Sequence, residues 1–253
     1  MTKADHILLL AGTFEARQLA KQLSTRLAGC RVTASFAGVV KDLPELGVPT
    51  RTGGFGGVQG LSDFLRAEHI TLVIDATHPF AAQMSRNAAE ACASLQLPLI
   101  RLERPIWTAL ADDIWTHFGS MQDAAKALPE TARAFLAVGR KEIRQFTWRD
   151  DIYGLARMIE APPQPLPPGW DLVLQRPSQS VSAEADLFRK HGITHLVTKN
   201  SGGMRAYAKI EAARKLKLPV FVIDRPHLPE AETAADIESV LEKTRSQQAR
   251  DGT

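Results

Sequence analysis

The chain has 253 residues, of which 44% are hydrophobic and 23% charged, so it holds enough apolar material for one large globular domain or two moderate ones. The formal net charge is only +3 and the Lys and Arg residues are scattered, which argues against a nucleic-acid-binding protein and weakly favours anionic ligands. The first apolar run, residues 7–10, is too short for a signal peptide or a membrane span, and neither Cys30 nor Cys92 lies in a CxxC pair. We therefore expect a cytoplasmic protein that binds neither nucleic acid nor a membrane.

In chain order, short apolar runs alternate with amphipathic stretches, a pattern typical of strand–helix–strand units and a parallel sheet. In the first half, the expected strands are residues 7–10, 32–36, 72–74 and 99–102, and the expected helices are 15–27, 61–69 and 81–95. In the second half, the expected strands are 134–138, 153–159, 170–174, 195–198 and 220–223, and the expected helices are 183–191 and 207–216. Beyond residue 230 the pattern is again helical.

Residues 70–105 and residues 193–226 are similar to each other. Both segments contain Ile-Thr, an apolar strand, a polar turn, an alanine-rich helix, Leu-Pro, a second strand and Arg-Pro, in that order. The shared order indicates an internal structural duplication. We therefore predict an α/β protein of two doubly wound, Rossmann-like parallel-sheet halves, residues 1–106 and 107–253, with the ligand site in a cleft between them.

Two polar turns in the first half follow expected strands, where parallel sheets bind their ligands. Gly12 and Thr13 follow the first strand, and the free N–H groups that begin the next helix can hold an anion. An ordinary turn with Thr13 as the helix N-cap is the alternative. Residues 75–80 follow a later strand and include His78, which can donate a hydrogen bond or act as an acid. A turn that caps the next helix is the alternative there.

Three further segments could contact a ligand. Residues 51–57 contain four glycines, which let the backbone approach a ligand closely, and Phe55 argues against a merely flexible loop. Residues 198–203 place Lys199 at a strand end before Asn, Ser and two glycines, which suits a phosphate or a carboxylate. Residues 139–141, Gly-Arg-Lys, also follow a strand.

Several common catalytic patterns are missing from the sequence. It contains no HxH pair, no GxSxG turn and no GxxxxGK[ST] loop. These absences disfavour a standard hydrolase and a P-loop nucleotidase, and the seven histidines are dispersed along the chain. We predict no metal ligands.

Taken together, these segments resemble the precorrin-6A reductase family of the cobalamin pathway. The motifs that carry the resemblance are Gly12-Thr13-x-Glu15, Ser35-x-Ala37-Gly38, Arg51-x-Gly53-Gly54-Phe55-Gly56, Asp75-Ala76-Thr77-His78-Pro79-Phe80-Ala81, Glu103-Arg104-Pro105-x-Trp107, Gly139-Arg140-Lys141, Val197-Thr198-Lys199-Asn200-Ser201-Gly202-Gly203 and Arg225-Pro226. The chain departs from the family at Ala11, where the family has glycine, and at residues 175–178, where the family has Arg-Gly-Pro-Phe and only Arg176 is carried over.

The resemblance implies an NADPH-dependent reduction of one C=C bond of precorrin-6A, a polycarboxylate macrocycle, to give precorrin-6B. It implies catalytic roles for His78 and Lys199. The implied cofactor-binding residues are Gly12, Thr13, Arg17, Ser35, Arg51, Gly53, Gly54, Phe55, Gly56, Thr77 and His78. The implied substrate-binding residues are Arg140, Lys141, Arg176, Lys199, Asn200, Ser201 and Gly202. We expect a monomer or a weak homo-oligomer.

Three alternatives stay open at this point. The substrate could be the cobalt-containing precorrin-6A of the anaerobic pathway, because no residue separates the two. The chain could be a non-catalytic nucleotide-binding protein, because a fold does not fix a function. It could also reduce a smaller metabolite, although the Arg and Lys residues near the second-half turns favour a large polyanion.

Overall fold

The computed structural model describes residues 5–27, 29–36, 38 and 45–251, which leaves Ala37 of the second motif outside the described residues. The chain forms two compact units. Unit 1 contains the residues up to 104 and those from 227 on, and unit 2 contains residues 105–226. Within the described ranges, no helix combines the length and apolar character needed to cross a membrane.

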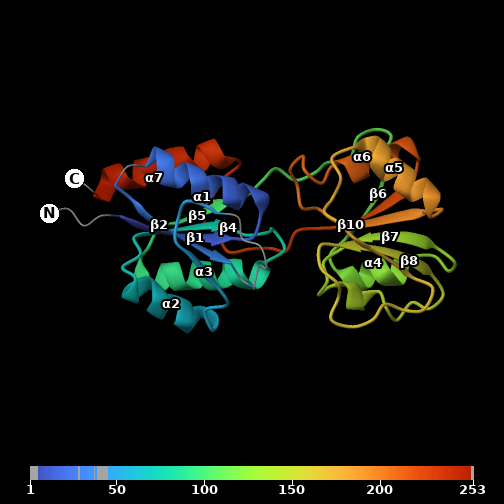
Figure 1. Ribbon diagram of the computed structural model, residues 1–253, viewed down its shortest axis with the longest axis horizontal. Helices are drawn as coiled ribbons and strands as arrows, with labels where there is room; N and C mark the ends of the chain where they lie inside the picture. Colours follow the sequence, from blue (N-terminus) through green and yellow to red (C-terminus); the bar gives the residue numbers. More distant parts are fainter. Residues whose placement is uncertain (1–4, 28, 37, 39–44, 252–253) are drawn as a thin grey trace. The chain divides into compact units, whose positions relative to one another are not determined.

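Unit 1 is built on one six-stranded parallel sheet with the strand order β12-β5-β4-β1-β2-β3. Its strands are β1 (His6–Ala11), β2 (Arg31–Phe36), β3 (Thr50–Thr52), β4 (Leu72–Ala76), β5 (Leu99–Leu102) and β12 (Glu232–Ala234). Its helices are α1 (Phe14–Arg26), α2 (Gly57–Ala67), α3 (Ala82–Leu95) and α7 (Ile237–Asp251). Helices α1 and α7 cover one face of the sheet, and α2 and α3 cover the other (Figure 1).

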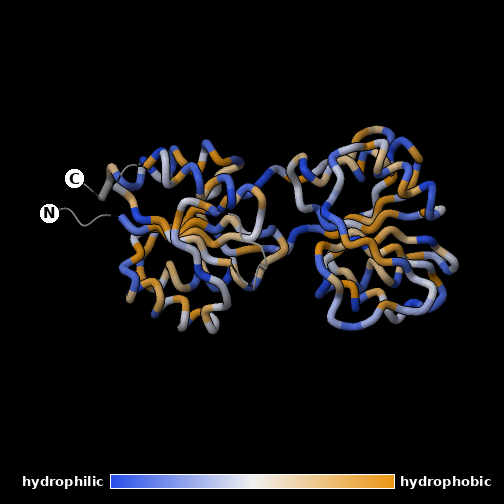
Figure 2. The backbone as a smooth tube through the Cα atoms, in the orientation of Figure 1, coloured by the Kyte–Doolittle hydropathy of each residue, from blue (hydrophilic) through white to orange (hydrophobic). Residues whose placement is uncertain are grey.

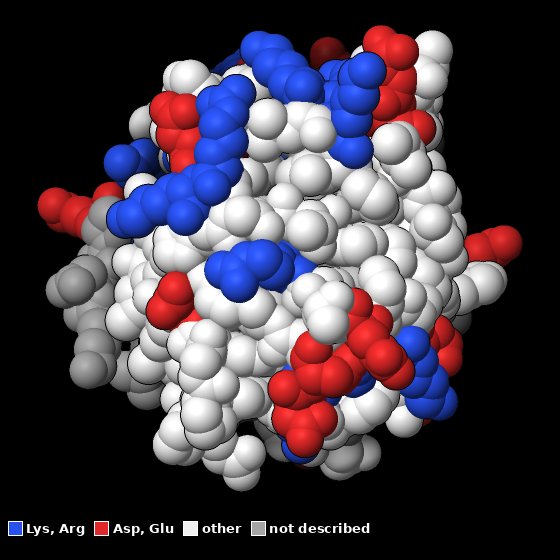
Figure 3. Space-filling view, turned by 90° about the vertical axis from the view of Figure 1, so that its right-hand side faces the viewer, with Lys and Arg blue, Asp and Glu red and all other residues white. Residues whose placement is uncertain are grey.

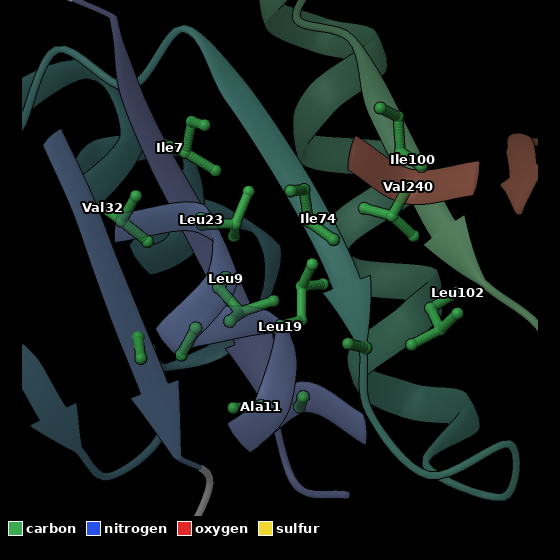
Figure 4. Packing of buried hydrophobic residues seen from close by; sticks show 14 of the residues in the cluster. Ile7, Leu9, Ala11, Leu19, Leu23, Val32, Ile74, Ile100, Leu102 and Val240 are labelled. Carbon is green, nitrogen blue, oxygen red and sulfur yellow. The ribbon is translucent and has the colours of Figure 1, made fainter. Parts of the chain in front are cut away.

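The apolar run in β1 explains why this strand is central. Ile7 and Leu9 pack on the α1 side of the sheet, together with Leu19 (Figure 4). Leu8 and Leu10 point to the opposite face and join the core under α2 and α3. Because successive side chains alternate between faces, only a strand covered on both sides needs such a continuous apolar run. Figure 2 shows the same concentration of apolar residues in the strands of both sheets.

Unit 2 contains a second six-stranded parallel sheet, with the strand order β6-β11-β10-β7-β8-β9. Its strands are β6 (Ile114–Phe118), β7 (Arg133–Ala137), β8 (Tyr153–Met158), β9 (Asp171–Leu174), β10 (His195–Lys199) and β11 (Pro219–Ile223). Its helices are α4 (Met121–Ala127), the short 3-10 helix η1 (Ile143–Gln145), α5 (Val181–Lys190) and α6 (Ala208–Lys215). Helices α5 and α6 lie on one face of this sheet and α4 lies on the other (Figure 1).

The two sheets have matching strand orders, as the internal duplication predicts. In unit 1 the order β3-β2-β1-β4-β5 corresponds to β9-β8-β7-β10-β11 in unit 2. The sixth strand is exchanged in both cases. The strand that follows β5 along the chain, β6, pairs with β11 of unit 2, and the strand that follows β11, β12, pairs with β5 of unit 1.

This exchange corrects the predicted domain boundary, which assigned all of residues 107–253 to the second half. Strand β12 pairs with β5, with Glu232 opposite Ile100, and Val240 and Leu241 of α7 are fully buried in the core of unit 1. The amphipathic pattern of the C-terminal helix predicts that it covers a sheet, but it does not say which sheet. The prediction placed this helix with the sheet that precedes it in the chain, that of the second half, and that assignment was wrong.

Candidate active site

The carboxyl edge of the unit 1 sheet reverses its strand order between β1 and β4, the position where open parallel sheets bind ligands. The turns after these two strands lie side by side. A Cβ atom built on Gly12 would lie 4.0 Å from the backbone nitrogen of His78 and 4.0 Å from the Cα of Thr77. Three of the predicted cofactor-binding residues are therefore neighbours.

Thr13 is the N-cap of α1, so the structural alternative for this residue is confirmed. Its Oγ1 accepts a hydrogen bond from the N–H of Ala16 at 3.1 Å and donates one to the carbonyl of Ala76 at 2.9 Å. The hydroxyl thus links the start of α1 to the end of β4. Arg17 donates from Nε to the carbonyl of Thr13 at 3.4 Å. Ligand contacts at this turn would come from the backbone.

The turn after β4 is held by a buried carboxylate. Asp75 accepts hydrogen bonds from the N–H of Thr77 at 3.1 Å and from its hydroxyl at 2.7 Å, and the other carboxylate oxygen accepts one from Ser85 at 2.6 Å. Arg101, which is opposite Asp75 in the strand pairing, lies 3.6 Å from the same carboxylate. Arg101 was not predicted, although an arginine inside the expected strand 99–102 was the available signal.

His78 has a defined hydrogen bond at one ring nitrogen. Its Nδ1 accepts from the N–H of Phe80 at 3.2 Å, so the proton of a neutral imidazole is on Nε2. The turn does not cap the following helix, because α3 begins only at Ala82. The capping alternative for residues 75–80 is therefore wrong.

The glycine-rich segment after β3 is held by one arginine. Arg51 donates to the hydroxyl of Ser35 at 2.8 Å and to the carbonyls of Gly53 and Gly54, both at 3.2 Å. Its guanidinium lies 3.9 Å from the centre of the Phe55 ring, and burial lowers its pKa from the usual value, although arginine stays charged. These contacts argue against a merely flexible loop, and they bring five predicted cofactor-binding residues together.

The N-terminus of α2 completes this segment. Gly56 precedes the helix with φ +81°, and Gly53 has φ +101°, both in the left-handed region that favours glycine. A side chain at either position would strain the backbone. The segment can thus bring its peptide groups close to a ligand.

The unit 2 sheet reverses its strand order between β7 and β10. Lys199, the last residue of β10, pairs through Nζ with Oε1 of Glu142 at 2.7 Å, and its side chain is 12% exposed. A Cβ on Gly139 would lie 3.5 Å from that Nζ, so the turn after β7 borders Lys199. Arg140 is exposed and pairs with Glu160.

The remaining predicted substrate-binding residues differ in their exposure, and Ser201 is half-buried and Gly202 buried in the loop after β10. Lys141 and Arg176 are exposed after β7 and β9. Asn200 is instead buried, and its amide exchanges two hydrogen bonds of 2.9 Å with the backbone of Trp107. The amide therefore holds a neighbouring segment. A polar residue at a strand end has the same sequence pattern whether it contacts the chain or a ligand.

A buried charge cluster lies under this edge of unit 2 and was not predicted. Arg157 of β8 forms an ion pair with Glu184 of α5, and both side chains are almost fully buried. Lys209 of α6 is also buried, and its Nζ donates to the carbonyl of Ala206 at 2.6 Å. Burial, together with the positive charge of Arg157, lowers the pKa of Lys209 to about 7, while Glu184 acts in the opposite direction.

The free energy of unfolding is expected to rise with pH between about 7 and 10 because of Lys209. In that window the unfolded chain holds a proton on this lysine that the folded chain lacks, so the destabilisation is full below pH 7 and vanishes above the pKa of an unfolded lysine. Urea unfolding at pH 7 and pH 9 measures the effect. Lys209→Met should have a flatter profile than the wild type, and identical profiles would contradict the assignment.

Charges of both signs occupy the surface. On the face shown in Figure 3, Lys and Arg lie beside Asp and Glu in the upper part, and the largest group of Asp and Glu lies in the lower part. Across the described part of the chain, no group of three or more His, Cys, Asp or Glu side chains is arranged to hold a metal ion.

Comparisons with known proteins agree on one family. A family model described as "Precorrin-6x reductase CbiJ/CobK" matches residues 6–245. A curated precorrin-6A reductase from Rhodobacter capsulatus is 45% identical over 93% of this chain and 94% of its own length. A cobalt-precorrin-6A reductase from Priestia megaterium is 31% identical, over 93% of this chain and 96% of its own.

A solved structure has the same fold. It is a CobK precorrin-6A reductase that is 44% identical to this chain, covers 96% of it and 97% of its own length, and superposes with a TM-score of 0.89. The family match and the relatives all extend across both sheets and both strand edges described above. The chain belongs to the precorrin-6x reductase family.

Proposed function

We propose that this chain reduces one C=C bond of precorrin-6A to give precorrin-6B, with NADPH as the hydride donor. The observation that carries the proposal is that each sheet has its own cluster of ligand-type groups where its strand order reverses. Glycine turns and an arginine occupy the edge of unit 1, and lysine and arginine side chains occupy the edge of unit 2. Membership of the family supports the reaction.

The edge of unit 1 fits a dinucleotide. Gly12 lies close to the turn after β4 and has no side chain, so a ligand could contact the backbone directly there. The N–H groups at the start of α1 suit a pyrophosphate. Arg51 is a cation next to the hydroxyl of Ser35, at the second strand where the ribose is commonly recognised. We propose that this pair binds the 2′-phosphate of NADPH and that Arg17 assists. When bound, the cofactor supplies the hydride.

His78 and Thr77 border the proposed nicotinamide position in unit 1. The protein's task is to hold the donor and the acceptor carbon close and aligned. The Nε2–H of His78 can orient a carbonyl or amide group there, and the buried Asp75 fixes the turn that carries both residues. Gly53 to Gly56, with Phe55, would cover the ring.

The edge of unit 2 suits a macrocycle with many carboxylate arms. Lys199 would exchange its contact with Glu142 for a substrate carboxylate, and Arg140, Lys141 and Arg176 would pair with others. Ser201 and Gly202 would contribute from the loop after β10. Asn200 has a positioning role in this proposal, because its amide holds Trp107.

Metal-free precorrin-6A is the preferred substrate in this proposal, because the relative named for it is more similar to this chain than the relative named for the cobalt form. A cytoplasmic monomer or weak homo-oligomer remains our proposal for the state of the enzyme. The two cysteines of the chain are free thiols, which fits a reducing compartment.

The proposal is tested by binding and turnover with both nicotinamide cofactors. Wild-type protein is expected to bind NADPH more tightly than NADH and to oxidise NADPH when precorrin-6A is added. Arg51→Gln should weaken NADPH binding about five- to tenfold more than NADH binding, because a partly exposed charge pair contributes roughly 1 kcal/mol. Absence of NADPH oxidation with either metal-free or cobalt-loaded substrate would refute the function, and an equal loss for NADH would refute the role of Arg51.

A further inference from the structure

A carboxylate of the chain itself occupies the position between β7 and β10 where the strand order of unit 2 reverses. The turn after β7 begins at Gly139, whose carbonyl accepts hydrogen bonds from the N–H groups of Glu142 at 3.0 Å and Ile143 at 3.1 Å. This turn directs the Glu142 side chain to the end of β10, where Oε1 accepts a hydrogen bond from Nζ of Lys199 at 2.7 Å. A carboxylate therefore already lies where the macrocycle is proposed to bind.

Gly139 provides the space for this carboxylate. A Cβ atom built on Gly139 would overlap Oε2 of Glu142 and would lie 3.2 Å from its Cδ. The φ angle of Gly139 lies outside the left-handed region, so its backbone conformation is open to other residues as well. The missing side chain, and not a special φ angle, is therefore what the structure uses at this position of the Gly-Arg-Lys motif.

The corresponding turn of unit 1 has the same spacing but a different carboxylate contact. Gly12 and Glu15 follow β1 as a Gly-x-x-Glu sequence. Glu15 forms an ion pair with Arg104 at 2.9 Å, and a Cβ atom on Gly12 would meet only backbone atoms of the turn after β4. A carboxylate packed on the glycine is thus a feature of unit 2, the unit to which we assign the anionic substrate.

The ion pair between Glu142 and Lys199 is more protected from water than the other ion pair at this edge. The side chains of Glu142 and Lys199 are 35% and 12% exposed, whereas those of Arg140 and Glu160 are both 50% exposed. Water screens an exposed pair, so its net contribution is small, and a partly buried charged hydrogen bond contributes more. A ligand that uses Lys199 must break this stronger contact first, and the cost is the same for every carboxylate.

We propose that Glu142 is a specificity-determining residue, which occupies Lys199 in the free enzyme and which a ligand carboxylate must displace. The inference rests on the proposed function. A small anion gains one contact in place of the contact that it breaks, so it is kept off the site. A macrocycle with several carboxylate arms still binds, because the arms held by other cations raise the effective concentration of the arm that reaches Lys199.

Removing the charge of Glu142 is expected to tighten substrate binding. In Glu142→Gln the KM for precorrin-6A should fall about three- to tenfold, the range for one partly buried charge pair. The kcat and the KM for NADPH should stay within about twofold, because the competing contact exists only while the macrocycle is absent. The inhibition constant of acetate, measured against precorrin-6A at constant ionic strength, should fall by the same factor, because acetate displaces the same carboxylate. If Glu142 only positioned Lys199, both constants would rise.

A second variant keeps the proposal testable if Glu142→Gln does not fold. Gly139→Ala retains the charge of Glu142 but places a Cβ atom where its carboxylate lies, so the KM for precorrin-6A should fall in this variant too.

Glu160→Gln is the matched control for both variants. It removes one negative charge from the same sheet edge without touching the contact of Lys199, and its KM should change by less than about twofold. An unchanged or raised KM in the folded variants of Glu142 and Gly139, or an equal fall in Glu160→Gln, would overturn the role of Glu142. A wild-type protein that does not reduce precorrin-6A would instead refute the proposed function, so the two failures are distinguished by the wild type.

Discussion

Replacing Lys199 by Met is expected to lower kcat/KM for precorrin-6A by about 30- to 150-fold while the affinity for NADPH stays unchanged. The side chain of Lys199 is only 12% exposed, and the residue lies at the carboxyl end of β10, where the proposed substrate binds. A hydrogen bond to a charged group in such a site contributes roughly 2–3 kcal/mol. Steady-state kinetics with both substrates varied would measure the loss.

The variant Lys190→Met is the control for this experiment. Lys190 is exposed in the last turn of α5, and its loss should change kcat/KM by less than twofold. The same small effect in Lys199→Met would remove Lys199 from the proposed substrate site. An equal loss of NADPH affinity would instead assign Lys199 to the cofactor.

Truncating Leu241 to Ala is expected to destabilise unit 1 by about 2–5 kcal/mol, a large part of the stability of an ordinary domain. Leu241 is fully buried in α7 and packs in the core that also contains β1 and α1. Removing three side-chain carbon atoms there leaves a cavity in unit 1, although the residue follows unit 2 in the chain. Urea unfolding would measure the loss.

Limited proteolysis identifies which unit becomes unstable. In Leu241→Ala we expect new cleavage sites between residues 5 and 104, with residues 105–226 still protected. Leu110→Ala is the matched control, because the side chain of Leu110 is 55% exposed and its removal leaves no cavity. New cleavage confined to unit 2 would contradict the assignment of α7 to unit 1.

The central strands could be predicted from the sequence because both of their faces are buried. Runs such as residues 7–10 must be apolar at every position, and that pattern is specific. The edge strands β3, β6 and β12 were missed. They have only three to five residues and exposed positions, so their sequences do not differ from those of loops. Their place in the fold is set by pairing with a neighbouring strand.

The sequence indicated which sheet edges carry the candidate site, but not which groups the individual residues contact. Polar turns after buried strands indicated the correct sheet edges, because parallel strands end together there. The partners of the individual groups depend on residues far away in the chain. Asn200 is engaged by Trp107, and Asp75 is paired with Arg101 across two strands. Predicting such pairs requires the register between strands, and a local sequence pattern does not contain this information.

The exchange of β6 and β12 has a consequence for the order in which the protein can fold as it is made. Unit 2 has all of its strands once residue 226 has emerged from the ribosome. Unit 1 begins first but lacks β12 and α7 until residues 232–251 have been translated, so the apolar side of β5 stays uncovered while the whole of unit 2 is made. Unit 1 therefore starts before unit 2 and is completed after it, and a ribosome that stalls between residues 226 and 251 would leave unit 1 exposed to chaperones and proteases.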